Sequence, residues 1–284
     1  MRAAAILAAA CLLACTPDFE ASSEVRDLRV LATQAEPPEA QFDATTVDPV
    51  DIRVLAVDPR TAAPITLHAA ICAPTDSHRC DEGPPVNDLG TRPLSTTLDI
   101  RDIPPEFVLL AQADDDLKGL GGVRVQYSFS VDHGDARDAV YGSKVLLYSP
   151  RGGTPNHNPA IAKLQLSREG VASGEVAAGG KLQIPANVEI GLRPVLVDGS
   201  RESYVTTDLR GNTVTLQEQP RYSFFVAPGA EVDRDTADEP LDGVAPPDGL
   251  SRITLRSVPG TLWIVVRDGR GGESWVTFPL ELPP

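Results

Sequence analysis

The sequence predicts an all-β protein with two β-sandwich domains in tandem behind a short apolar N-terminal segment. Short runs rich in Val, Ile and Leu recur between turn residues along the whole chain, and no long amphipathic helix interrupts them. Pro (26 residues) and Gly (23 residues) are frequent among the 284 residues, as chains with many turns require. A chain of this length holds one large domain or two small ones.

The N-terminus predicts export. Met1-Arg2 is followed by the apolar run Ala3–Ala14. This run is shorter than the about 20 residues that a membrane-spanning helix needs, and it fits the apolar region of a secretory signal. The run leads directly into Leu12-Leu13-Ala14-Cys15.

Leu12-Leu13-Ala14-Cys15 resembles a bacterial lipobox, with an ordinary signal peptide near a chance cysteine as the alternative. The resemblance implies a lipoprotein signal peptide over residues 1–14, lipidation of Cys15 and a lipidated tether over residues 15–24. Acyl chains contribute about 0.8 kcal/mol for each buried CH₂, so several of them make a permanent anchor. Thr16, where an inner-membrane lipoprotein commonly has Asp, resembles the outer-membrane default. We therefore expect a lipid anchor in the outer membrane, with the domains on its periplasmic or its cell-surface face.

Two cysteines remain after processing, Cys72 and Cys80. In an exported protein such a pair predicts a disulfide. A zinc site with His68 and His78 is the alternative, because thiols and imidazoles are zinc ligands. The seven residues between the cysteines are an unusual ligand spacing, and the oxidising compartment favours the disulfide.

The first predicted domain covers residues 25–150. Val123–Val131 alternates apolar and polar residues, which is typical of a strand with one buried face. Phe107–Ala111 is also expected to be a strand. The other expected strands are Val25–Ala35, Val50–Val57, Ile65–Cys72, Ser95–Arg101 and Ala139–Tyr148.

Ser149–Pro159 is rich in Pro, Gly and Asn and lacks aliphatic side chains, so we expect a semi-rigid hinge that buries little. The second predicted domain covers residues 154–284. Asp268-Gly269 between two apolar runs predicts a hairpin, and Trp263 and Trp275 in these runs are expected to face the core of this domain. The expected strands are Ile161–Leu166, Lys181–Ile184, Val188–Val197, Ser203–Thr207, Val214–Gln217, Tyr222–Val226, Arg252–Arg256, Leu262–Val266 and Ser274–Leu282.

Seven or more short strands in each half are typical of an immunoglobulin- or fibronectin-like sandwich, although the antibody spacing of Cys, Trp and Cys is absent. One mixed-β domain followed by a C-terminal sandwich is the alternative. The opening Val25–Ala32, the segment Pro155–Pro159 and the Trp263–Trp275 hairpin resemble uncharacterised surface lipoproteins of GC-rich Gram-negative bacteria. That resemblance implies no activity.

The net charge of −15 argues against binding to nucleic acid and against electrostatic docking on anionic lipid. No nucleophile elbow, zincin motif or phosphate-binding loop occurs in the sequence. His133 lies beside Asp132 and Asp135, as a general base would, but a turn needs the same residue types. We predict no catalytic residue, no cofactor and no enzyme activity.

Two acidic clusters offer the oxygen ligands that calcium prefers. They are Asp114–Asp116 and the set Asp233, Asp235 and Asp238. The second set lacks the Gly and the distal Glu of an EF-hand loop, and solubility explains most acidic loops. The three residues are therefore weak calcium candidates, and no metal is predicted.

These observations predict a non-catalytic structural or interaction module of the cell envelope. The expected partners are the membrane, through the lipid, and an envelope protein or a glycan. A carbohydrate- or small-ligand-binding module, with structural calcium as a further option, is the alternative.

Overall fold

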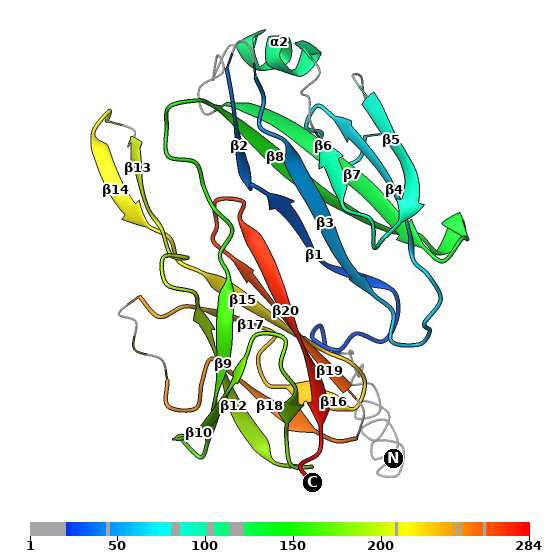
Figure 1. Cartoon of the computed structure of the whole chain (residues 1–284), viewed down its shortest axis with the longest axis vertical. Helices are drawn as coiled ribbons and strands as arrows, with labels where there is room; N and C mark the ends of the chain where they lie inside the picture. The colour runs from blue at the N-terminus through cyan, green and yellow to red at the C-terminus, as the bar shows by residue number, and fades with distance from the viewer. Residues whose placement is uncertain are drawn as a thin grey trace, which may run out of the picture.

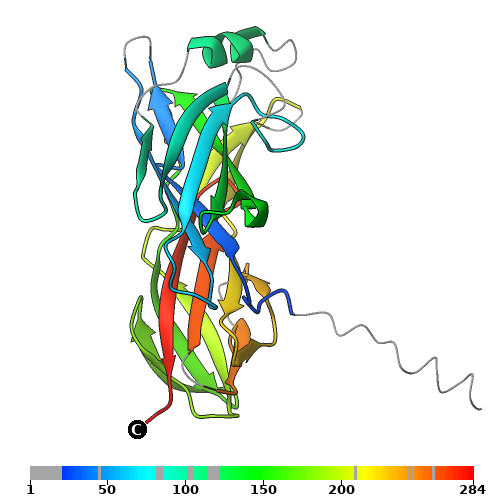
Figure 2. The same cartoon turned by 90° about the vertical axis from the view of Figure 1, so that its right-hand side faces the viewer.

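The computed structural model describes residues 21–43, 46–80, 86–100, 105–113, 122–207, 210–241, 244, 246–257 and 260–284. Two β-sandwiches lie end to end, as Figure 1 and, from the side, Figure 2 show. The strands of the first run from Arg29 to Pro150 and those of the second from Ile161 to Glu281. The predicted all-β class with two sandwich domains in tandem is confirmed. Within the described ranges, no helix is both long and apolar enough to cross a membrane.

The first sandwich pairs a three-stranded sheet with a five-stranded one. The smaller sheet has the order β1 (Arg29–Glu36), β3 (Val50–Val57), β6 (Leu98–Ile100). The larger sheet has the order β2 (Glu39–Phe42), β8 (Val140–Pro150), β7 (Val123–Asp132), β4 (Thr66–Cys72), β5 (Val86–Pro93). The first two strands thus belong to different sheets, and β2 runs parallel to the last strand, β8.

The second sandwich repeats this order and adds a strand at each edge of one of its sheets. One sheet has the order β10 (Val171–Ala177), β9 (Ile161–Arg168), β12 (Glu189–Leu196), β18 (Ser251–Leu255), β16 (Ala230–Val232). The other has the order β11 (Leu182–Gln183), β20 (Glu273–Glu281), β19 (Gly260–Arg267), β15 (Arg221–Val226), β17 (Thr236–Asp238). Here too a short strand, β11, runs parallel to the last strand, β20. Both domains therefore have an immunoglobulin-like arrangement of two packed sheets.

An arm extends from the second domain toward the first (Figure 1). It is the antiparallel hairpin of β13 (Ser203–Thr207) and β14 (Thr213–Gln217), inserted between β12 and β15. A two-stranded hairpin is marginally stable in water, so its base needs contacts with the domains.

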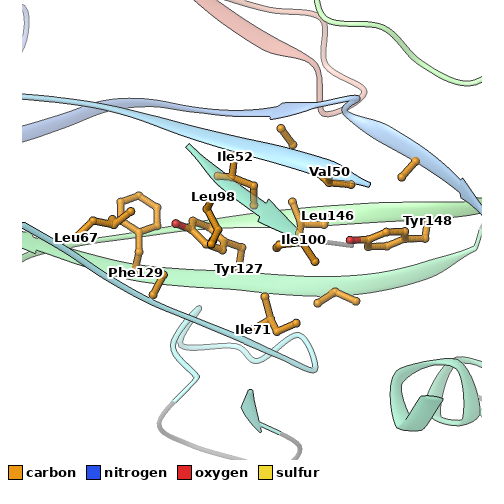
Figure 3. Packing of buried hydrophobic residues seen from close by; sticks show 14 of the residues in the cluster. Val50, Ile52, Leu67, Ile71, Leu98, Ile100, Tyr127, Phe129, Leu146 and Tyr148 are labelled. Atoms are coloured by element: carbon orange, nitrogen blue, oxygen red, sulfur yellow. The ribbon is translucent and has the colours of Figure 1, made fainter. Parts of the chain in front are cut away.

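Each domain has its own apolar core. The predicted alternation of Val123–Val131 is confirmed, because the odd-numbered side chains of this run are all buried between the sheets. Figure 3 shows Tyr127 and Phe129 of β7 packed with Ile52, Leu98 and other residues of the facing sheet. The second core takes Leu262, Ile264 and Val266 from β19.

The expected strand Phe107–Ala111 is wrong, because this segment lies in the helix α2 (Pro105–Ala113). Pro105 suits the first helical position, and Glu106 in the first turn suits the helix dipole. A short 3₁₀ turn, η1 (Ala136–Asp138), lies between β7 and β8. The sequence also predicts one helical turn over Asp114–Leu120, and this segment lies outside the described residues.

Five strands were not predicted: β2, β5, β10, β16 and β17. All five lie at sheet edges. An edge strand pairs on one side only and buries less, so its sequence carries fewer apolar residues than a central strand.

Candidate functional site

The two domains meet in an apolar cluster of their own. Val25, Leu31, Ala32, Trp263 and Val265 are buried there. Partly buried side chains surround this cluster: Leu55, Val57, Phe225, Ala227 and Trp275. The contact joins β1 and β3 of the first domain to β15, β19 and β20 of the second, and β1 lies beside β20 (Figure 1).

The expectation that Trp263 and Trp275 belong to the core of the second domain is wrong. Along β19, Leu262, Ile264 and Val266 face the core, whereas Trp263 and Val265 face the first domain. A strand buried on both faces is apolar without alternation. The unbroken apolar run Leu262–Val266 is the sequence signal of this second buried face.

The chain that enters the first domain is bound to the second. Val25 N donates to Val226 O at 2.8 Å, and Val226 N donates to Ser23 O at 2.8 Å. The Ser22 hydroxyl donates to Asp235. β17 pairs with β15 only over Arg221–Ser223, so the edge of β15 at Val226 is available to the entering chain. Residues 21–24, assigned to the tether from the sequence, are therefore packed against the second domain.

Residues 150–154 of the junction are exposed, as its composition predicts, but the residues that follow do not form a low-burial hinge. Asn156 is 1% exposed, and its Nδ2 donates to Asp268 Oδ2 at 2.7 Å. Asn158 Nδ2 donates to Ala35 O at 2.6 Å, and its Oδ1 accepts from Glu273 N at 2.8 Å. Amide side chains can bond to both domains at once, so the Asn residues fix the junction.

Glu273, on β20, binds two strands of the first domain. Its Oε2 accepts from Thr33 N of β1 at 3.2 Å and from Lys144 Nζ of β8 at 3.4 Å. Its Oε1 lies 2.5 Å from Nη2 of Arg267. The Glu273 side chain is 7% exposed and that of Lys144 is 13% exposed, so the pair is largely desolvated.

Arg270, in the turn between β19 and β20, joins the arm to both domains. Its Nη1 lies 3.0 Å from Glu218 Oε1 and 3.6 Å from Glu202 Oε2, and its Nη2 lies 3.6 Å from Glu39 Oε2 of β2. The guanidinium also stacks on Tyr204, 4.4 Å from the ring centroid.

The carboxyl of Glu218 shows the electrostatic cost of this arrangement. Burial raises the pKa of Glu218, and the Asp268 carboxylate adds to the rise, while Glu202 N and Arg270 oppose it. Arg270 is thus the counter-ion that keeps several carboxylates together at the base of the arm.

The predicted disulfide between Cys72 and Cys80 is present, with an S–S distance of 2.20 Å. The loop that it closes is fastened to the outer face of the larger first-domain sheet. Gln126 of β7, fully buried, accepts from Thr75 N at 3.0 Å through Oε1. Cys15, the predicted lipidation site, lies outside the described residues.

The three calcium candidates have protein partners instead of a common centre. Asp233 accepts from the backbone and the side chain of Arg252, Asp238 from Arg221, and Asp235 from Ser22. Across the described residues, no three His, Cys, Asp or Glu side chains form a group that could hold a metal ion. The cluster Asp114–Asp116 lies outside those residues.

His133 connects two turns through side-chain hydrogen bonds. Its Nδ1 lies 3.1 Å from Pro64 O, and its Nε2 lies 3.2 Å from Asp58 Oδ2. The side-chain hydrogen bonds of Arg60 hold the pKa of Asp58 well below its usual range, with further help from Arg60 N and His133. Both imidazole nitrogens therefore have structural contacts.

No protein-family model matches the chain, and no curated protein matches it significantly. Among solved structures, it is similar to the two tandem V-type regions of VCBP3, a v-region-containing chitin binding protein. The identity is 10%, the match covers 89% of this chain and 100% of the other, and the TM-score is 0.31. For the N-terminal Ig1-2 module of the Drosophila receptor protein tyrosine phosphatase DLAR, the identity is 12%, the coverage 91% and 100%, and the TM-score 0.22.

Expressed alone, the piece Thr154–Pro284 should unfold cooperatively, because all residues of its core come from its own strands. Its two Trp side chains should nevertheless be exposed to solvent, because the first domain that covers them is missing. We expect fluorescence emission at longer wavelength than in the whole chain and a weak near-ultraviolet circular dichroism of Trp. Emission unchanged from the whole chain would contradict the placement of Trp263 at the domain contact.

Proposed function

We propose that the chain is a rigid, non-catalytic interaction module of the cell envelope, anchored in the outer membrane through Cys15. The observation that carries the proposal is the contact between the domains, which combines a buried apolar cluster with desolvated hydrogen bonds and ion pairs. Contacts between domains of one chain are usually more polar than the interfaces of obligate complexes, and they permit relative motion of the domains. A contact with a buried apolar cluster supports two domains that act as one body.

The path of the chain into the first domain supports a position of the second domain close to the anchor. The backbone is fixed to β15 from Ser23 onward. The chain from Cys15 to Ser23 spans about 28 Å at most, even when fully extended. An acylated Cys15 therefore keeps the second domain near the membrane surface and limits how far the module reaches.

The geometry around His133 supports a non-catalytic role. A general base needs a nitrogen that can take a proton from a substrate. In His133 one nitrogen contacts a backbone carbonyl and the other a carboxylate that Arg60 also binds. His133, the candidate base in the sequence, therefore has a structural role in connecting the two turns.

The anchor is tested by Cys15→Ala. We expect the variant to remain unlipidated and to leave the membrane fraction, because the acyl chains supply the membrane affinity. Cell fractionation and detergent phase separation measure this. Cys11→Ala, in the same apolar run, is the matched control and should fractionate like the wild type. A Cys15→Ala protein that still enters the detergent phase would show that the anchor assignment is wrong.

A further inference from the structure

The outer face of the larger first-domain sheet carries an ordered set of polar side chains. In the strand register, His68 of β4 lies opposite Ser130 of β7, and Ser130 lies opposite Tyr141 of β8. The neighbouring row places Ala70 opposite Ser128. Side chains two residues apart point to the same face, so the two rows share one surface. The small residues Ala70 and Ser128 leave a hollow between the larger ones.

This hollow is a pocket of about 310 Å³. Ligand pockets in proteins begin at about this size. Its polar lining comprises His68, Arg79, Asp88, Ser128, Ser130 and Tyr141.

The disulfide loop forms one wall of the pocket. Arg79, in this loop, stacks on the Tyr141 ring, 4.2 Å from its centroid. The Cys72–Cys80 bond and the buried Gln126 hold the loop in place on the sheet. The wall is therefore fixed before any ligand arrives, which lowers the entropy that binding loses. Tyr141 itself remains 55% exposed.

The lining groups select by charge. Asp88 only accepts hydrogen bonds, and its side chain is 68% exposed. Arg79 only donates. An anionic ligand meets the Asp88 carboxylate, and a cationic ligand meets the Arg79 guanidinium. A neutral ligand that both donates and accepts can bond to either group without charge repulsion.

The remaining groups fit hydroxyl chemistry. The hydroxyls of Ser128, Ser130 and Tyr141 can each donate and accept. His68 contacts Thr91 Oγ1 through Nδ1 at 3.1 Å, and its Nε2 lies 3.9 Å from Asp88 Oδ1. The Tyr141 ring adds an aromatic surface, against which the C–H face of a sugar ring packs.

We propose that this pocket binds a neutral carbohydrate, with one sugar ring in contact with Tyr141. The inference rests on the proposed function as an interaction module and names the class of its partner.

The test is saturation-transfer difference NMR on the full chain in a detergent without a sugar headgroup. The probes are glucose, galactose, mannose and N-acetylglucosamine oligomers, with glucuronate as an anionic counterpart of glucose. We expect transfer to at least one neutral sugar. Tyr141→Ala should weaken that binding on the order of tenfold, because the aromatic contact is lost. Val145→Ala is the matched control, since Val145 is also exposed on β8 but lies outside the pocket.

A second variant, Ser128→Leu, fills the hollow and leaves the aromatic ring in place. It should abolish binding. Thermal unfolding checks that both variants are folded. If Ser128→Leu does not fold, Tyr141→Ala alone tests the proposal. The proposal is overturned when no neutral sugar shows transfer, when glucuronate binds more tightly than glucose, or when folded Tyr141→Ala binds like the wild type. None of these results affects the anchor, whose failure appears separately in the fractionation of Cys15→Ala.

Discussion

Trp263→Ala should destabilise the protein by about 3–5 kcal/mol, the cost of removing a large buried aromatic side chain. Trp263 is 7% exposed and packs at the contact between the domains. Because each domain keeps its own core, the loss should fall on the coupling between them. We expect the thermal unfolding of the wild type to be one transition and that of the variant to divide into two.

Calorimetry and the fluorescence of the remaining Trp275 measure this effect. Val171→Ala is the control, because Val171 is a large apolar residue of the second domain that is 68% exposed. Its substitution should change stability by no more than about 0.5 kcal/mol. A Trp263→Ala protein that unfolds in one unshifted transition would mean that the apolar cluster does not couple the domains.

Glu273→Ala should cost about 3–5 kcal/mol, because removing one member of a buried ion pair leaves the other charge without compensation. The ammonium of Lys144 and the amide of Thr33 both lose their acceptor. Denaturant titration measures the loss. Glu281→Ala, on the same strand, removes an exposed pair with Lys181 and should cost less than about 1 kcal/mol.

The double variant Glu273→Leu with Lys144→Met separates the pair from its surroundings. Apolar replacement of both members of a buried pair is often neutral, so it should recover much of the stability that Glu273→Ala loses. Equal losses in Glu273→Ala and Glu281→Ala would show that Glu273 is solvated and does not join the domains.

The fold class, the central strands and the disulfide can all be predicted from the sequence. Val123–Val131 alternates with a clear period, and the two runs of the last hairpin carry enough apolar side chains to specify buried strands. Cys72 and Cys80 were predicted to pair because no other cysteine remains after processing. These features depend on local pattern and on chain composition, which a sequence displays directly.

The contacts that the outer faces of the strands make are visible in the folded structure and not in the sequence. The unbroken apolar run Leu262–Val266 indicates that both faces of β19 are buried, but nothing in that run says that the first domain covers the face of Trp263. The composition of the junction predicts a solvated hinge, yet Asn156 is buried. Its partners Asp268 and Glu39 lie far away in the sequence, so the sequence around Asn156 does not reveal them. The pocket beside Tyr141 likewise requires three strands and the disulfide loop in register. Such contacts depend on which surfaces the fold brings together, and local periodicity does not encode them.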